Sequence, residues 1–234
     1  MTGRVLTLHG MAPDVDPGRF AFRNLTDAAV LRHFLSAAPP FVPLADALAG
    51  RGTALTIDDA TRAGADAAML AREFGHPVTL FVNPGQIESG APHHFLLLNA
   101  LLDRLDGAPR EFEGRRYDTS TTRKRQALRR AIKDPLRSIA REEQRLAFVR
   151  DLAARWNLGT LEIPPQFETL SRSDLLALLA AGVDLQNHGW SHSHHAALTP
   201  AESAREIQAG REWFRRELGK DSPWFAVPFG DALP

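Results

Sequence analysis

Two carboxylates and two imidazoles carry the clearest chemical signal in this sequence. Asp58 and Asp59 are adjacent at the end of the β-branched run 53–57, and His188 and His192 stand four residues apart much further along the chain. One carboxylate and two imidazoles can hold a divalent metal and leave coordination positions open. The second carboxylate can then act on a metal-bound water. These residues predict a hydrolase.

The composition excludes several other kinds of protein. The chain has 234 residues, 44% of them hydrophobic, so it can bury the core of one large α/β domain, which we expect, or of two small ones. It has no cysteine, which excludes disulfides and thiolate metal sites. Its 28 basic and 28 acidic residues cancel, so the chain as a whole has no electrostatic reason to bind nucleic acid or membrane.

Targeting and membrane segments are not evident in the sequence. The apolar run near Met1 is too short for a signal peptide, and no stretch approaches the roughly 18 residues of a membrane span. We therefore expect a cytoplasmic protein, although a leader trimmed from the chain would leave no trace.

Short apolar strands alternate with amphipathic helices, which predicts parallel strands joined by helical crossovers. The last helix has a capping-box pattern at Thr199 and a stop at Gly219. The expected strands are 4–8, 53–57, 77–82, 183–186 and 224–227, and the expected helices are 26–36, 61–74, 171–180 and 199–218.

The segment 92–158 is long, helical in pattern and rich in arginine, with Pro109 and Pro135 as expected breaks. We interpret it as an elaborated connection. Between Arg115 and Arg150 it has twelve Lys and Arg against four Asp and Glu. Two interpretations remain open: a solvated helical face, or a basic lip that meets an anionic substrate, such as a phosphate-bearing glycan carrier.

Polar residues follow the strands at their carboxyl ends, where a parallel barrel places its chemistry. Singly, each of these residues is more often a cap or a turn. Together they predict one site, formed by His9, Asp58 with Asp59, Asn83, His188, and the segment from Pro228 to Gly230.

Three segments resemble the motifs of a known family. Leu55 to Ala60, Asn187 to His192 and Phe225 to Gly230 are similar to T-F-D-D-G, N-H-[ST]-x-x-H and R-x-P-[YF] of the polysaccharide deacetylases of the NodB-homology type, carbohydrate esterase family 4. The resemblance implies a distorted (β/α) barrel as a single domain, 1–234, with 92–158 as a helical, arginine-rich insertion. It also implies that Asp58 is the general base and that the metal ligands are Asp59, His188 and His192. The Phe229 N–H would be the oxyanion donor, and the neighbouring Pro228 would belong to the same substrate-binding segment.

The chain departs from the family motifs at several positions. Ala60 and Gly189 replace residues that supply no ligand, whereas Ala226 replaces an arginine that orients the base. The family usually carries a Leu-x-x-His segment with the catalytic acid after this point. The segment ending in His9 resembles it, as in a circularly permuted branch that includes the poly-N-acetylglucosamine deacetylases. The alternative is a truncated chain in which His9 caps a strand.

Other histidines and the tryptophans are weaker candidates. His194 and His195 lie close to the metal motif but lack its spacing, and His93 and His94 are expected at the entry to a surface helix. His33 and His76 are expected to be structural. Asn83 is either part of a turn or a substrate contact, and Trp190 and Trp224 either stack on a sugar or pack in the core.

The sequence thus predicts a zinc-dependent hydrolase that removes N-acetyl groups from an amino sugar or polysaccharide. Three alternatives remain open. They are an enzyme of the same fold acting on another non-peptide C–N bond, a metal-retaining glycan-binding protein without turnover, and a module that binds nucleic acid or an anionic surface through its arginines. We rank the last one lowest because the basic segment lacks interleaved aromatics for base stacking, and therefore expect no nucleic-acid partner.

Overall fold

Four parallel strands form the central sheet of the computed structural model, which describes residues 3–230 and 233. Leu8 pairs with Ile57, and Val82 pairs with Asn187, so the strands end at the same edge of the sheet. This mixed α/β architecture with a parallel sheet confirms the coarse fold class predicted from sequence. In spatial order the strands are β1 (Arg4–Leu8), β4 (Thr53–Ile57), β5 (Val78–Val82) and β8 (Asp184–Asn187).

One face of the sheet packs against four helices. Successive side chains of a strand point to opposite faces of the sheet, and Leu55, Leu80 and Leu185 point to this one. They form the main hydrophobic cluster together with side chains from the helices. A Thr199 capping box opens the last helix, and left-handed Gly219 (φ 64°) ends it, as predicted. The helices are α1 (Ala28–Ala37), α3 (Arg62–Glu73), α8 (Arg172–Ala180) and α9 (Pro200–Leu218).

The opposite face of the sheet carries a smaller cluster. Ala54 and Phe81 pack there with the short helix α2 (Leu44–Leu48) and with Trp224. In place of the expected strand 224–227, Phe225 forms a single parallel bridge with Asn187. Among the described residues no pairing joins this segment to β1, so closure of the sheet into a barrel stays a prediction.

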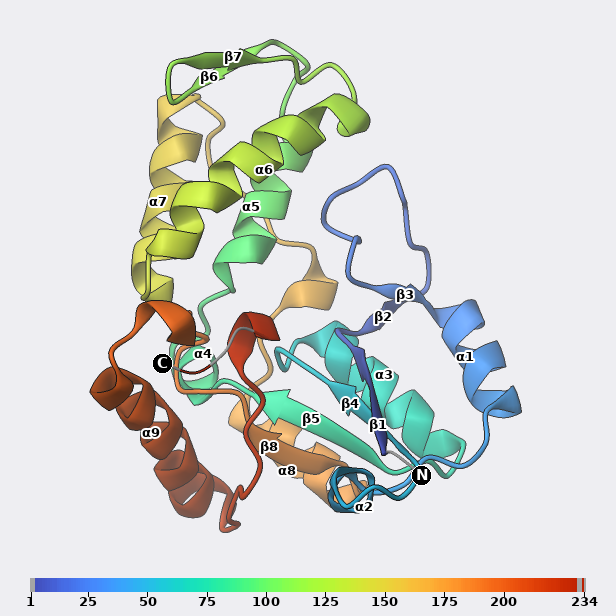
Figure 1. Cartoon of the computed structure of the whole chain (residues 1–234). Coiled ribbons are helices and arrows are strands. Elements are labelled where there is room, and N and C mark those ends of the chain that lie inside the picture. The colour runs from blue at the N-terminus through green and yellow to red at the C-terminus, as the bar shows by residue number, and fades with distance from the viewer. Residues whose placement is uncertain (1–2, 231–232, 234) are drawn as a thin grey trace.

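The segment 92–158 folds around a hydrophobic cluster of its own and forms the upper part of the molecule in Figure 1. The expected break at Pro135 is wrong. Pro135 lies near the end of a helix, where it removes only one backbone bond while Leu128, Ile132 and Leu136 keep the helix packed. The segment contains α5 (His94–Asp103), the hairpin of β6 (Arg110–Phe112) and β7 (Arg115–Tyr117), α6 (Thr122–Ser138) and α7 (Glu142–Arg155).

The remaining elements are short and connect the larger ones. None of the helices in the described part of the chain has the length and apolar character needed to cross a bilayer. The short elements are β2 (Met11–Ala12), β3 (Thr26–Asp27), α4 (Pro84–Ser89) and the 3₁₀ turns Pro165–Phe167, His195–Ala197 and Pro228–Gly230.

We predict that Gly210→Ala destabilises the protein and disturbs the loop that follows β8. A Cβ at position 210 of α9 would overlap the Asn187 side chain, which accepts a hydrogen bond from Gly189 N (3.0 Å) and donates one to Ile207 O (2.9 Å). We expect a loss of about 1–3 kcal/mol in the free energy of unfolding, measured by denaturant titration. The exposed change Gln208→Ala is the control. Equal stability of the two variants would contradict the prediction.

Candidate metal centre and active site

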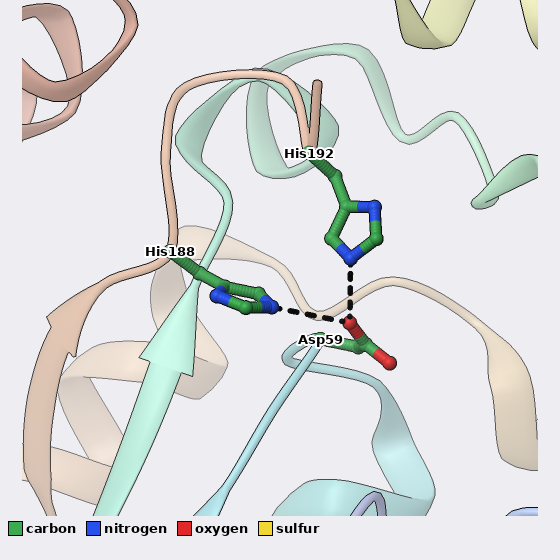
Figure 2. Close-up of side chains that lie close together, drawn as sticks. All are labelled: Asp59, His188 and His192. Carbon is green, nitrogen blue, oxygen red and sulfur yellow. Dashed lines mark ion pairs between the residues drawn. The ribbon is translucent and has the colours of Figure 1, made fainter. Parts of the chain in front are cut away.

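Asp59, His188 and His192 meet at the carboxyl edge of the sheet (Figure 2). Asp59 Oδ1 lies 3.2 Å from His192 Nε2 and 3.6 Å from His188 Nε2. All three side chains are buried, and one ligand atom of each lies within 4.8 Å of the others. The structure therefore brings together the three residues to which the sequence assigned a metal.

Strained backbone positions concentrate around these residues. Asp59 (φ 77°), Ala60 (φ 47°) and His192 (φ 56°) all lie in the left-handed region, as does Phe229 (φ 66°). This conformation costs an ordinary L-residue roughly 1–2 kcal/mol, and such strain often marks functional sites. Ala60, which stands where the motif has glycine, therefore occupies a position that favours glycine.

A backbone contact fixes the orientation of the His188 ring. His188 Nδ1 donates a hydrogen bond to the carbonyl oxygen of Ala226 (2.9 Å), because a carbonyl can only accept. In the neutral ring, Nε2 then carries the free lone pair, and this atom faces Asp59. A ligating histidine commonly has its other nitrogen bound in this way, so the arrangement fits a divalent ion held by two imidazoles and one carboxylate.

Asn83 and Trp190 hold the loop that carries the two histidines. Buried Asn83 donates from Nδ2 to the carbonyls of His188 (2.6 Å) and Gly189 (3.2 Å). The Trp190 carbonyl accepts from Gly85 N (2.7 Å), and its partly buried side chain packs against the main hydrophobic cluster. These contacts give both residues a structural role, and their predicted contacts with substrate stay predictions.

Asp58 and His9 lie side by side at the same edge. They follow the paired residues Ile57 and Leu8, and Asp58 N donates to the Leu8 carbonyl (3.0 Å). Burial raises the pKa of Asp58; the charge of His188 lowers it, that of Asp59 raises it, and that of His9 lowers it. The Oδ1 atom of Asp58 is buried without a hydrogen-bond partner among the described residues. The arrangement leaves a carboxylate oxygen available next to the metal candidates.

The segment after the Phe225 bridge covers His192. Pro228 is buried, whereas Phe229 is 47% exposed and its ring lies edge-on to the His192 ring, with the centroids 4.7 Å apart. The Arg145 guanidinium lies over the same phenyl ring, 4.8 Å from its centroid. Phe229 therefore stands between the metal candidates and helix α7.

Four residues of the segment 92–158 reach this site and were not assigned to it from sequence. His93 and His94 are buried, contrary to the expectation of a surface helix. His93 Nε2 donates to the backbone carbonyl of Asp59 (3.1 Å), while Glu142 accepts from His94 N (2.6 Å) and Nδ1 (2.7 Å). Glu142 also comes close to His93 and His192, and Arg145 lies 3.8 Å from it.

The sequence does contain a signal for two of these four residues, namely their helical spacing with apolar residues. Glu142 and Arg145 fall on the same stripe of α7 as Leu146 and Val149, at helical spacing. Charged side chains inside an apolar stripe must find partners when they are buried. This pattern indicates a polar cluster at the inner face of the helix.

The buried charges at the centre influence one another strongly. Burial by itself raises the pKa of Asp59, but the interactions with His188 and His192 outweigh it and hold that pKa well below its usual range. Burial lowers the pKa of His188, yet the close contact with Asp59 and the charges of both aspartates raise it above its ordinary value. For His192 burial dominates and lowers the pKa to about 4. His192 is therefore neutral near pH 7, as a metal ligand must be.

We predict that the metal-free protein loses stability as the pH falls from about 6.5 to about 4. The unfolded chain binds a proton at His192 near its ordinary pKa of 6.5, whereas the folded protein binds it only near 4. The stabilisation that comes from neutral His192 is therefore complete above about pH 6.5 and is lost as the pH falls to about 4. It amounts to at most about 3 kcal/mol in the free energy of unfolding. Denaturant titrations in chelator at several pH values should show a shallower dependence for His192→Gln. If the free energy of unfolding changed with pH equally steeply in His192→Gln and in the exposed control His33→Gln, the prediction would be contradicted.

Comparisons with known proteins agree with this geometry. Residues 46–233 match the family model for polysaccharide deacetylase. The fold is similar to that of a Streptococcus pyogenes deacetylase, PplD, in complex with acetate, with a TM-score of 0.59 at 12% identity over 99% of this chain and 76% of that one. It is also similar to IcaB from Ammonifex degensii, with a TM-score of 0.54 at 15% identity over 100% and 77%.

A comparison with curated proteins gives no match. The family model nevertheless covers most of the chain and includes both aspartates and both histidines of the centre. The chain belongs to the polysaccharide deacetylase family.

Proposed function

We propose that this protein is a metal-dependent hydrolase that removes N-acetyl groups from an amino sugar or polysaccharide. The observation that carries the proposal is the convergence of Asp59, His188 and His192 beside Asp58 in a member of this family. The family acts on C–N bonds of N-acetylated carbohydrates. The ion and the detailed roles of the residues are our inference from the geometry.

Asp59, His188 and His192 would hold the ion, through Oδ1 and two Nε2 atoms. One carboxylate with two imidazoles suits zinc best. Bound there, zinc supplies a Lewis acid for the acetamide carbonyl and lowers the pKa of a water molecule. The Ala226 carbonyl keeps the Nε2 lone pair of His188 directed at the site.

Asp58 would act as general base and His9 as general acid. Asp58 Oδ1 lies buried without a donor among the described residues, so it is free to take the proton of the attacking water. The Phe229 N–H would stabilise the oxyanion as the carbonyl becomes tetrahedral. His9, close enough to lower the pKa of Asp58 by its charge, would protonate the departing amine.

We extend the proposal to the architecture. The parallel bridge of Phe225 beside β8 and the small inner cluster of Ala54, Phe81 and Trp224 support a distorted barrel that is open between β1 and the last segment. The chain, 1–234, would then form one catalytic domain with 92–158 as an elaboration. The placement of β1 beside β4 supports the permuted order in which His9 supplies the acid.

A second function is favoured by one observation. Ala226 stands where the motif has an arginine that orients the base. A protein that retains metal and binds glycan without turnover would tolerate an unoriented base. Acetate release by the wild-type protein separates the two functions.

We predict that Asp58→Asn keeps the metal but loses turnover, whereas His192→Ala loses the metal. The amide introduced at position 58 cannot accept the water's proton, so acetate release should fall by about 10² to 10⁴. Acetate release from N-acetylated oligosaccharides and metal content by elemental analysis are the measurements. The exposed change Asp151→Asn is the control. Wild-type rates in metal-loaded Asp58→Asn would reject the base assignment.

We predict that His9→Ala lowers turnover without changing metal content. Removing the acid leaves the amine to depart unprotonated, so a leaving group of lower basicity should recover part of the rate. Acetate release from a sugar amide and from an activated aryl acetamide would be compared, with the exposed change His33→Ala as control. An unchanged rate on both substrates would favour the alternative in which His9 only caps a strand.

A further inference from the structure

A cleft of about 370 Å³ lies next to the candidate metal centre and has a cationic lining. Lys133 and Arg137 of α6 and Arg145 of α7 border it, together with His194 and Phe229. None of the described residues that line it is acidic. Its volume is within the range of small-molecule sites.

The α6 side of the cleft concentrates positive charge on one helix face. Arg129, Lys133 and Arg137 follow one another at intervals of four residues, which places them on the same side. Burial lowers the pKa of Lys133, and the charges of Arg129 and Arg137 lower it further. None of the ion pairs among the described residues includes Lys133 or Arg137. Within the part of the chain that the structure describes, no ion pair with an acidic side chain compensates the repulsion between Lys133 and Arg137.

Arg145 adds a second feature to the cleft, a buried guanidinium with an N–H donor that has no hydrogen-bond partner among the described residues. Its side chain is only 2% exposed, and its Nη1 has no hydrogen-bond partner in the described part of the chain. Its Nε donates to the Ile139 carbonyl (2.7 Å) and its guanidinium lies over Phe229, so the group is fixed in place. Glu142 Oε2 forms an ion pair with Nη1 at 3.8 Å, which is too long for a hydrogen bond and leaves this N–H donor unused. A buried guanidinium with an unused donor, at the wall of a cleft, is suited to an oxygen acceptor.

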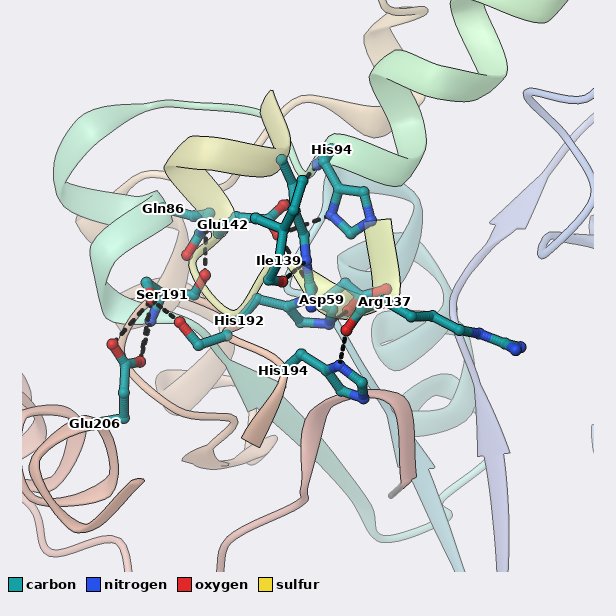
Figure 3. A network of polar contacts seen from close by, with 12 residues as sticks. Asp59, Gln86, His94, Arg137, Ile139, Glu142, Ser191, His192, His194 and Glu206 are labelled. Carbon is teal, nitrogen blue, oxygen red and sulfur yellow. Dashed lines mark hydrogen bonds and ion pairs between the residues drawn. The ribbon is translucent and has the colours of Figure 1, made fainter. Parts of the chain in front are cut away.

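The cleft is joined to the metal loop by direct contacts (Figure 3). His194 N donates to the Ala140 carbonyl (3.0 Å), and His194 Nδ1 donates to the Arg137 carbonyl (2.8 Å). The Phe229 ring separates Arg145 from His192. A ligand in the cleft would therefore lie beside a sugar whose acetamide is at the metal centre.

We propose that this cleft is a subsite for an oxyanion group, a phosphate or an acidic sugar's carboxylate, carried by the N-acetylated substrate. The inference rests on the proposed deacetylase function. It gives a role to Lys133, Arg137 and Arg145 within the basic segment from Arg115 to Arg150. Lys133 and Arg137 attract the anion, and Arg145 binds it at the inner end.

Binding measured in chelator tests the subsite without turnover. Calorimetric titrations would compare N-acetylglucosamine 6-phosphate, N-acetylmuramic acid and neutral N-acetylglucosamine. We expect the wild-type protein to bind at least one anionic sugar roughly 10-fold or more tightly than the neutral one, and to lose this preference at high salt. The double variant Lys133→Gln/Arg137→Gln should lose most of the preference. The matched control, Arg123→Gln/Arg130→Gln, removes two exposed charges elsewhere on α6 and should keep it.

The outcomes separate the subsite from the chemistry. No preference for either anionic sugar, or equal loss in both double variants, overturns the subsite, whether or not the metal-loaded enzyme releases acetate. A preference that depends on Lys133 and Arg137 supports it even if no sugar is deacetylated, in which case the proposed function fails instead. Preference for the phosphate or for the carboxylate identifies the source of the oxyanion.

Discussion

The site depends on the contacts of a single buried carboxylate oxygen with two histidine rings. Asp59 Oδ1 faces the Nε2 atoms of both His188 and His192, which come from a loop far away in sequence. An ionised carboxylate buried among apolar groups is costly unless it is paired. The histidines, or an ion between them and Asp59, supply that pairing. The left-handed backbone of Asp59 and His192 is the conformational cost of bringing these atoms together.

The surroundings hold this centre from two directions. From the sheet side, the Ala226 carbonyl fixes the His188 ring, and Asn83 binds the backbone of the same loop. From the insertion side, His93 donates to the Asp59 carbonyl, and its ring packs against His192. These contacts limit the movement of the Asp59 and His188 donor atoms. The buried Nδ1 of His192, by contrast, has no hydrogen-bond partner among the described residues, so the His192 ring is held by packing against His93 and Phe229.

The regular elements and the central triad follow from sequence, whereas the insertion's share of the site does not. The strands 4–8 and 53–57 and the capped helix ending at Leu218 have strong local signals, namely β-branched runs, a capping box and a terminal glycine. The shared strand edge then brings Asp59 to the histidines. By contrast, the hairpin β6–β7 has strands of only three residues with no clear alternation, and Pro135 is tolerated because of packing that becomes visible only in three dimensions. The burial of His93 and His94 likewise depends on where the insertion docks.

The two parts of the chain therefore have different tasks. In the proposed enzyme, the sheet edge carries the groups for bond cleavage, and metal and proton chemistry constrain their identity. The insertion contributes Arg145, Lys133 and Arg137 to the neighbouring cleft, where shape and charge select what enters. Because it has its own hydrophobic cluster, the insertion can change its surface charge without unfolding the sheet that holds the metal ligands. In the proposed enzyme, elements that do not carry out the reaction determine the choice of substrate. Family membership would then fix the reaction class more firmly than the substrate.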